Sequence, residues 1–243
     1  MFEELDYRPT PIGALSLRRR RELKLGVDVF EIKLGDAFLM SSLFTASEVA
    51  LARLGLARCR SKRLEIAVGG LGLGYTAKTV LEHDSVGSLV VIELLDAVID
   101  WHREGLVPLG RDLNADSRCR IVQGDFFALA SGEGGLDRDT PGRRFDAILV
   151  NIDHTPDQLL DQRSAAFYSD AGLRSLARHI KPGGVFGLWS NDGPDDAFTA
   201  RLMAVFADVE AVAVTFDNPL QEGRTVTQTV YLAAPRGHSQ EEA

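Results

Sequence analysis

The sequence has few cysteines, no excess of positive charge and no long apolar run. Its two cysteines, Cys59 and Cys119, lack metal-ligand spacing, which favours free thiols in a reducing compartment and gives no metal site. No apolar run approaches the ~18 residues of a membrane-spanning helix. The opening residues, MFEELDYRPTP, lack the apolar core of a secretion signal. These absences predict a cytoplasmic protein that makes no contact with a membrane.

The charge balance is acidic. Asp and Glu together number 35 against 27 Lys and Arg, which gives a formal net charge of −8. A general nucleic-acid binder needs a broad basic surface, so we expect no nucleic-acid partner. A cationic substrate is compatible with this balance, and so is plain solubility. The run Arg18–Arg21 does not alter the conclusion, because neighbouring residues of a strand face opposite sides and pairing with the excess acids is the favoured interpretation.

The hydrophobic pattern changes near residue 62. Before it, residues 15–17 and 27–34 alternate apolar and polar side chains, which predicts antiparallel strands, and 47–56 shows helical spacing. Beyond it, short apolar runs alternate with helix-compatible segments. We therefore expect a small N-terminal β-rich unit with a linking helix over 1–62, and a second, larger domain over 63–243.

The second region has the order of an α/β domain. Strands are expected at 64–68, 88–93, 119–123, 145–151, 184–189, 209–216 and 226–233. Helices are expected at 75–83, 95–105, 158–162, 169–179 and 194–206. Alternation of this kind implies a parallel sheet covered on both faces, and the short final loop makes the last strand antiparallel. The fold class is thus α/β, with a Rossmann-like, mostly parallel sheet of seven strands. Residues 131–144 and the tail after Pro235 are expected to be surface loops.

The segment LEIAVGGLGLGYT, residues 64–76, is the strongest motif. An apolar strand ends in a turn that contains Gly70, Gly72 and Gly74, and a helix follows. Glycine adopts positive φ without strain and lets the backbone approach a ligand closely. Glu93 closes the next apolar run, 19 residues beyond Gly74, where nucleotide-binding folds place an acceptor for ribose hydroxyls. The combination predicts a nucleoside site.

Polar side chains also follow the next two strands. Asp125 ends the third and can accept from the amine of a base, with Phe126 beside it. The fourth delivers Asn151, Asp153 and His154 to the same edge of the sheet. A single acid at a strand end is more often a cap, but acids at three successive strand ends, together with the glycine turn, favour a binding site.

Other polar and aromatic residues have plainer interpretations. Asp192, Asp195 and Asp196 follow the fifth strand and have the charge to receive an ammonium group, but the favoured interpretation is that Asp192 or Asp195 caps the helix that begins near Pro194. Tyr168 and Trp189 have the chemistry to line an alkyl-amine channel, but aromatic residues at such positions are usually core.

At this point the chain resembles a known group. The segments GGLGLG, VIE, QGDFF, FDAILVNID and LARHIKPGGVFGLWS are similar to the class I S-adenosylmethionine-dependent methyltransferase fold. The N-terminal β unit, the double glycine, the block 146–153 and FYS around Tyr168 resemble the spermidine-synthase-like proteins, the polyamine aminopropyltransferases. The resemblance covers roughly residues 25–233.

The resemblance assigns roles. It implies that Glu93 holds the ribose, that Asp125 meets the adenine amine and that the turn Gly70–Gly74 passes beneath the arm of the donor. The donor would be S-adenosylmethionine or its decarboxylated form, without a metal. The resemblance also implies a homodimer and an aspartate just after the fourth strand that activates the attacking amine.

The chain departs from that pattern in three places. Asn151 stands where the catalytic aspartate aligns, so Asp153 is the predicted proton acceptor, with Asn151 and His154 in support. The glycine turn carries no acid that selects the decarboxylated donor. Where the family has a glutamine and a tyrosine–histidine pair, the segment TASEVALARLGL offers only Glu48.

Three functions stay open. The leading hypothesis is aminopropyl transfer from decarboxylated S-adenosylmethionine to a small amine, with release of methylthioadenosine. The uncharged glycine turn favours an alternative, a methyltransferase that uses intact S-adenosylmethionine on a small molecule. Asn151 in place of an aspartate favours the third, a nucleoside-binding protein without catalysis.

Overall fold

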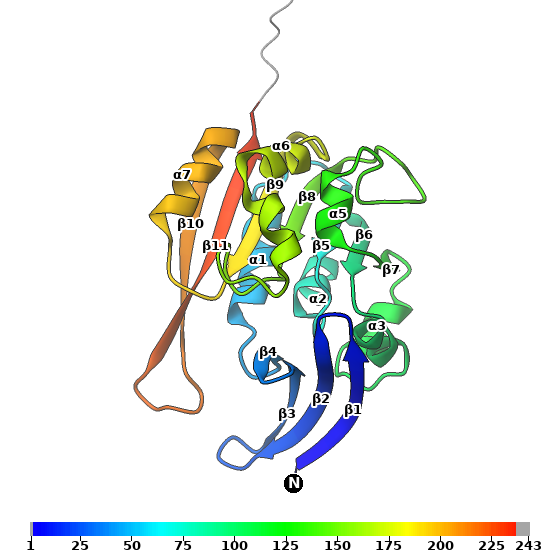
Figure 1. The fold of residues 1–243 in the computed structure, drawn as a ribbon, viewed down its shortest axis with the longest axis vertical. Coiled ribbons are helices and arrows are strands. Elements are labelled where there is room, and N and C mark those ends of the chain that lie inside the picture. Colours follow the sequence, from blue (N-terminus) through cyan, green and yellow to red (C-terminus); the bar gives the residue numbers. More distant parts are fainter. Residues whose placement is uncertain (1, 237–243) are drawn as a thin grey trace, which may run out of the picture.

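The computed structural model describes residues 2–236, which form two β-sheets (Figure 1). The smaller sheet is antiparallel, in the order β1-β2-β3-β4. Its strands are β1 (Phe2–Thr10), β2 (Gly13–Glu22), β3 (Val27–Leu34) and β4 (Ala37–Ser41). The strands expected at 15–17 and 27–34 are confirmed within β2 and β3. The predicted tail loop after Pro235 lies, from residue 237 onward, outside the described residues.

Strand β1 escapes sequence analysis because its sequence, FEELDYRPT, has little apolar alternation and most of it is exposed or half-buried. Charge pairing compensates: Arg18 and Arg19 of β2 pair with Glu4 and Glu3 of β1 at 3.4 and 2.7 Å. Arg20 and Arg21 pair with other acids of the same sheet. The interpretation of the arginine run as acid-paired is therefore confirmed.

The larger sheet has the order β10-β11-β9-β8-β5-β6-β7. Its strands are β5 (Leu64–Gly69), β6 (Val86–Glu93), β7 (Cys119–Gln123), β8 (Phe145–Val150), β9 (Ile180–Ser190), β10 (Phe206–Asp217) and β11 (Thr225–Pro235). Strands β5 to β9 are parallel, and β11 runs antiparallel to both of its neighbours. The predicted mostly parallel sheet of seven strands with an antiparallel last strand is confirmed.

Two buried apolar clusters lie on the two faces of this sheet, each covered by helices. One face carries α1 (Ala46–Ala57), α2 (Tyr75–Leu81), α3 (Asp96–Arg103) and α4 (Gly110–Ala115). The other carries α5 (Phe126–Ser131), α6 (Asp170–Ala177) and α7 (Asp196–Val205) (Figure 1). None of the described helices is long and apolar enough to cross a membrane. The domain boundary at residue 62 stays a prediction.

One helix prediction is wrong. Residues 158–161 are irregular, and a 3₁₀ helix, η1 (Gln162–Tyr168), follows them. Side chains replace the regular backbone pattern here: Asp153 accepts from the Leu160 N–H at 2.7 Å, and Asp161 accepts from the Arg163 N–H at 2.9 Å. The short helices α4 and α5 are not predicted, because six residues are too few for a periodic signal. The expected surface loop 131–144 contains the buried residues Leu136 and Asp137.

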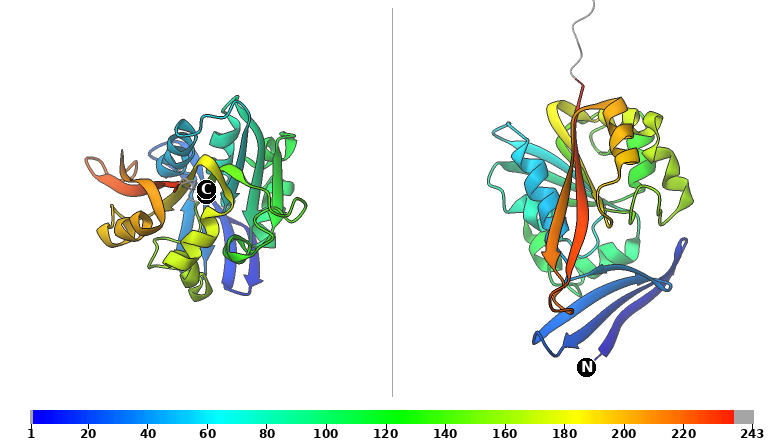
Figure 2. Two further views of the ribbon diagram at one scale, coloured as in Figure 1. Left: turned by 90° about the horizontal axis from the view of Figure 1, so that it is seen from above. Right: turned by 90° about the vertical axis from the view of Figure 1, so that its left-hand side faces the viewer.

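The small sheet covers the carboxyl edge of the large one (Figure 2). Two polar contacts join β1 to α3: Arg8 pairs with Asp100 at 2.7 Å, and the Trp101 indole donates to Asp6 at 2.6 Å. Ile12, Ile32, Leu39 and Met40 from the small sheet face the ends of the parallel strands across a cavity. This arrangement encloses the site that the strand ends build.

Candidate functional site

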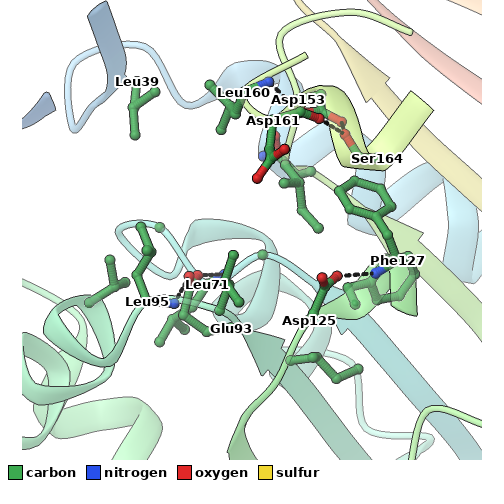
Figure 3. Close-up of a pocket in the computed structure, with 18 of the residues that line it drawn as sticks. Leu39, Leu71, Glu93, Leu95, Asp125, Phe127, Asp153, Leu160, Asp161 and Ser164 are labelled. Carbon is green, nitrogen blue, oxygen red and sulfur yellow. Dashed lines mark hydrogen bonds between the residues drawn. The ribbon is translucent and has the colours of Figure 1, made fainter. Parts of the chain in front are cut away.

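A cavity of about 370 Å³ lies between the carboxyl edge of the large sheet and the small sheet. It is lined by eight of the nine predicted site residues: Gly70, Gly72, Glu93, Asp125, Phe126, Asn151, Asp153 and His154. The ninth, Gly74, caps α2 behind the turn. Figure 3 shows Glu93 and Asp125 on one side and Asp153, Asp161 and Ser164 opposite. The carboxyl ends of parallel strands meet at one edge, which explains why residues so far apart in sequence converge.

The glycine turn is held from three sides. Its Leu71 N–H donates to Glu93 at 2.9 Å, the Gly72 carbonyl lies 2.9 Å from His102 Nε2, and the Leu73 N–H lies 3.2 Å from Met40 Sδ. Gly70, at φ +90°, passes so close to strand β8 that an added Cβ would lie 2.2 Å from the Asn151 carbonyl oxygen. Only glycine fits, and the exposed backbone forms one wall of the cavity.

Glu93 is buried beneath this turn, with 8 % of its surface exposed. Its two carboxylate oxygens accept from the Leu71 and Leu95 N–H groups, each at 2.9 Å. Burial raises the pKa of the Glu93 carboxyl, while these backbone donors oppose the rise. A carboxylate has about four lone-pair sites. Because the two short bonds use one site on each oxygen, both oxygens keep acceptor capacity for hydroxyl groups such as those of a ribose.

Asp125 caps helix α5, accepting from the Phe127 and Ala128 N–H groups at 2.9 and 3.1 Å through Oδ1. The neighbouring Phe126 is buried and packs against Gly69, where a Cβ would lie 2.7 Å from its ring. The aspartate is thus a cap and a cavity residue at once.

Asn151 and His154 follow β8. The Asn151 N–H bonds to the Gly69 carbonyl at 2.9 Å, which fixes the residue beside the glycine turn. The His154 carbonyl accepts from the Asn191 N–H at 2.7 Å, which joins the loop after β8 to the end of β9. The backbones of both residues are anchored, and both residues line the cavity.

Asp153 is buried, and three donors surround its carboxylate. Oδ1 accepts from the Leu160 N–H at 2.7 Å, and Oδ2 accepts from the Ser164 and Tyr168 hydroxyls at 3.2 and 2.9 Å. Burial raises the pKa of the Asp153 carboxyl against the effect of these donors. Its role as proton acceptor stays a prediction, and the hydrogen bonds favour a structural role in holding loop 153–168.

We expect Asp153→Ala to lower the free energy of unfolding by about 2–4 kcal/mol, because it leaves the buried Tyr168 hydroxyl and the Leu160 N–H without their acceptor. The Ser164 hydroxyl keeps the Asp161 carbonyl as an acceptor at 2.6 Å. Asp153→Asn keeps one carbonyl oxygen and should lose about 1 kcal/mol. Urea unfolding of the two variants measures both values. Equal stability of Asp153→Ala and the wild type would contradict the structural role.

Glu48 is the site residue to which sequence analysis assigned no role. It lies in the first turn of α1, is 5 % exposed and lines the cavity. Its neighbour Ser47 accepts from the Trp189 indole N–H at 2.8 Å, which attaches this corner of α1 to the end of β9. The sequence signal is an acid at the start of a helical segment whose other charged residue is Arg53. That pattern is also typical of an ordinary first-turn acid.

Other candidates have plainer roles. Asp195 caps α7 by accepting from the Ala197 and Phe198 N–H groups, as expected. Trp189 lines the cavity, whereas Tyr168 is buried against Asp153. Both cysteines are free, and burial raises the pKa of Cys59 to about 12 and that of Cys119 to about 11. Among residues 2–236, no group of three or more His, Cys, Asp or Glu side chains is placed to hold a metal.

Comparison with solved structures identifies the fold. Spermidine synthase from Thermotoga maritima superposes with a TM-score of 0.70 at 16 % identity, over 95 % of this chain and 72 % of that one. A spermidine synthase in complex with the transition state analogue AdoDATO gives 0.70, also at 16 % identity, over 95 % and 73 %. Human methyltransferase-like protein 13 in complex with SAH gives 0.55 at 19 % identity, over 81 % and 85 %. The fold is thus a methyltransferase-like α/β fold.

Sequence comparison finds two curated relatives of the chain. Polyamine aminopropyltransferase 2 of Pseudomonas aeruginosa is 26 % identical over 157 residues, which is 62 % of this chain and 42 % of that protein. Polyamine aminopropyltransferase of Aeropyrum pernix is 27 % identical over 126 residues, 52 % of this chain and 37 % of that protein. No family model matches the chain. The chain is similar in sequence to these polyamine aminopropyltransferases and in fold to spermidine synthase, and its matches span about two fifths of the length of the curated relatives.

Proposed function

We propose that this chain is a transferase that binds an S-adenosyl-type sulfonium donor at the carboxyl edge of its large sheet and moves the aminopropyl group to an amine. The observation that carries the proposal is the single cavity that joins Glu93 and Asp125 to the loop after β8 beneath the small sheet. The likeness to two polyamine aminopropyltransferases supports the same reading.

Strand order distributes the proposed contacts. Asp125 after β7 receives the adenine amine, Glu93 after β6 receives the ribose hydroxyls, and the backbone at Gly70 and Gly72 after β5 lies under the donor arm. Asn151 after β8 is then next to the reacting carbon. Its amide oxygen can accept a hydrogen bond from the attacking amine and so orient the nitrogen lone pair.

The protein contributes little covalent chemistry to the proposed reaction. The amine nitrogen forms a bond to the carbon beside the sulfonium, the C–S bond breaks, and its electron pair stays on sulfur as methylthioadenosine leaves. One proton from the nitrogen passes to a base. Since the sulfonium already provides a good leaving group, the side chains mainly orient the partners and remove that proton.

One observation favours aminopropyl transfer and another favours methyl transfer. The superposition on spermidine synthase covers 95 % of the chain and therefore includes most of the small sheet, whereas the methyltransferase-like neighbour covers 81 %. Methyl transfer remains the second candidate because the buried residues Leu71 and Leu73 leave the glycine turn without a charge to repel the carboxylate of intact S-adenosylmethionine.

Product analysis tests the proposal. The purified protein is incubated with decarboxylated or intact S-adenosylmethionine and a panel of amines, and the nucleoside product is identified by mass spectrometry. We expect methylthioadenosine to accumulate with the decarboxylated donor at least ~100-fold faster than without protein, a modest fraction of the acceleration that enzymes reach. Formation of adenosylhomocysteine from the intact donor would contradict the proposal and indicate methyl transfer instead.

Binding of a nucleoside without any product would instead support the non-catalytic alternative. In the same assay, Asp153→Asn separates the two roles of that residue. Retained product formation fits the anchoring of loop 153–168. Loss of product with unchanged nucleoside affinity would restore Asp153 as the proton acceptor.

A further inference from the structure

Glu48 lies on the part of the cavity wall that α1 and α2 form, where the Thr76 hydroxyl donates to its carbonyl oxygen at 3.4 Å. The bond from Trp189 to Ser47 places it beside β9, whereas Asp125 follows β7. Four strand spacings separate β7 from β9, which is about 19 Å at ~4.8 Å each. With the nucleoside over β6 and β7 and the reacting carbon near β8, the end at Glu48 is left for the acceptor.

The Ser47 hydroxyl is the side-chain donor to Glu48, and it is shared with a second acceptor. The Ser47 hydroxyl accepts from the Trp189 indole and lies 2.5 Å from Gln228 Oε1 and 3.0 Å from Glu48 Oε2. Gln228 directs its Nε2 to Asn191, so its oxygen faces Ser47. A hydroxyl has one proton, and the shorter contact takes it. The longer bond from Ser47 to Glu48 is then the weaker of the two, and the Glu48 carboxylate is poorly supplied with donors.

The pKa of Glu48 agrees with this shortage of hydrogen-bond donors. Burial raises the pKa of its carboxyl to about 7, against the effect of its own backbone N–H and of Ser47. The titratable group that faces it is Tyr75 on α2, whose pKa burial also raises. Ser47, Gln228 and Trp189, from α1, β11 and β9, are uncharged. A cation that enters this corner would convert Glu48 to its charged form.

The other four carboxyl groups in the cavity lining are already engaged. Glu93 and Asp125 accept from backbone N–H groups and are the proposed nucleoside contacts. Asp153 holds loop 153–168, and Asp161 accepts from the Arg163 backbone and guanidinium. A second ammonium group in the cavity would therefore have no carboxylate to itself, and an unpaired buried charge is strongly unfavourable.

The small sheet adds only apolar side chains to the lining. They are Ile12, Ile32, Leu39 and Met40. Tyr75 and Trp189 supply two aromatic rings near Glu48, a setting that suits one ammonium group attached to a hydrocarbon. This wall would solvate a long polycation poorly.

We propose that the acceptor is an amine with one nitrogen and an apolar body, which enters as an ammonium ion paired with the Glu48 carboxylate. That carboxylate takes one proton, and the free amine then attacks the carbon near β8. This inference rests on the proposed transfer to an amine and names its substrate class. This substrate class agrees with the absence of the residues that line a diamine channel in the family. One buried carboxyl group binds one nitrogen, and the apolar wall contacts the rest of the molecule.

A matched pair of amines tests the inference. Calorimetry compares n-butylamine with 1,4-diaminobutane, which has the same carbon chain and a second ammonium group, with and without saturating methylthioadenosine. We expect n-butylamine to bind at least ~10-fold more tightly, because the second charge is desolvated without a partner. Extension to n-hexylamine should add roughly a further tenfold, since two more methylenes meet the apolar wall. Tighter binding of 1,4-diaminobutane, or no binding of any of the three, would overturn the inference.

Glu48→Gln identifies the contact. It keeps the shape and a hydrogen bond to Ser47, and we expect it to weaken n-butylamine at least ~10-fold while methylthioadenosine affinity is unchanged. Glu82→Gln, on the exposed end of α2, is the matched control and should change neither affinity. Unchanged amine affinity in Glu48→Gln would remove Glu48 from the site.

The pH dependence provides a readout that a purely structural role would not alter. Ammonium binding requires ionised Glu48, so affinity should rise as pH increases through about 7 and then level off. Glu48→Gln should abolish this rise. A failure of the proposed transfer is distinguished from a failure of this inference, because the first appears as absent methylthioadenosine production and the second as the wrong order of amine affinities.

Discussion

Gly70→Ala is expected to lower the free energy of unfolding by about 2–5 kcal/mol and to weaken nucleoside binding at least ~10-fold. A side chain at φ +90° is strained, and its Cβ would lie 2.2 Å from the Asn151 carbonyl oxygen. Relief of that clash has to move the glycine turn, which takes the Leu71 N–H away from Glu93. Urea unfolding and calorimetry with methylthioadenosine measure the two effects.

Gly26→Ala is the matched control. Gly26 also has positive φ, +66°, but nothing lies within 4 Å of its Cβ position in the turn between β2 and β3. We expect a loss of about 1–2 kcal/mol from backbone strain alone and unchanged nucleoside affinity. Equal losses of unfolding free energy in the two variants would show that the close approach of Gly70 to β8 does not affect stability.

Glu93→Gln is expected to weaken methylthioadenosine binding about 100-fold. Two hydrogen bonds from ribose hydroxyls to a charged acceptor contribute about 1.5–3 kcal/mol each, and the amide loses the charge. Its NH₂ group would also face either the Leu71 or the Leu95 N–H, which places two donors together. Calorimetry on the folded variant measures the loss.

Asp96→Asn provides the control, since Asp96 is a nearby exposed carboxylate at the start of α3. It should bind methylthioadenosine like the wild type. Burial raises the pKa of Glu93, so the ionised acceptor is lost at a higher pH than for an exposed glutamate. Nucleoside affinity should therefore fall as pH decreases through the mildly acidic range, and a flat profile would argue against Glu93 as the ribose acceptor.

The large sheet was predictable because its strands are uniform. Residues of β5 and β8 are apolar almost throughout, and buried parallel strands require this. The antiparallel pair β10 and β11 follows from a loop too short for a crossover helix. The four-stranded small sheet was predicted only in part, because β1 depends on ion pairs with β2 that no hydrophobic pattern announces.

The strand-end residues of the site were predictable for a related reason. Parallel topology brings every carboxyl end to one edge, so the positions of Glu93, Asp125 and Asn151 along the chain already imply their meeting. Their roles toward a ligand stay proposals. The homodimer, the cytoplasmic location and the absence of a nucleic-acid partner likewise stay predictions.

The sequence by itself determined the α/β class, the strand ends and the glycine turn, because these depend on local periodicity and on backbone freedom. Only the tertiary structure decided the burial and the hydrogen-bond partners of each carboxyl group. Asp153 lies among donors from loop 153–168, whereas Glu48 is buried with one hydroxyl neighbour between α1 and β9. Burial and hydrogen-bond partners set the charge of a carboxyl group, and both come from segments far away in the chain.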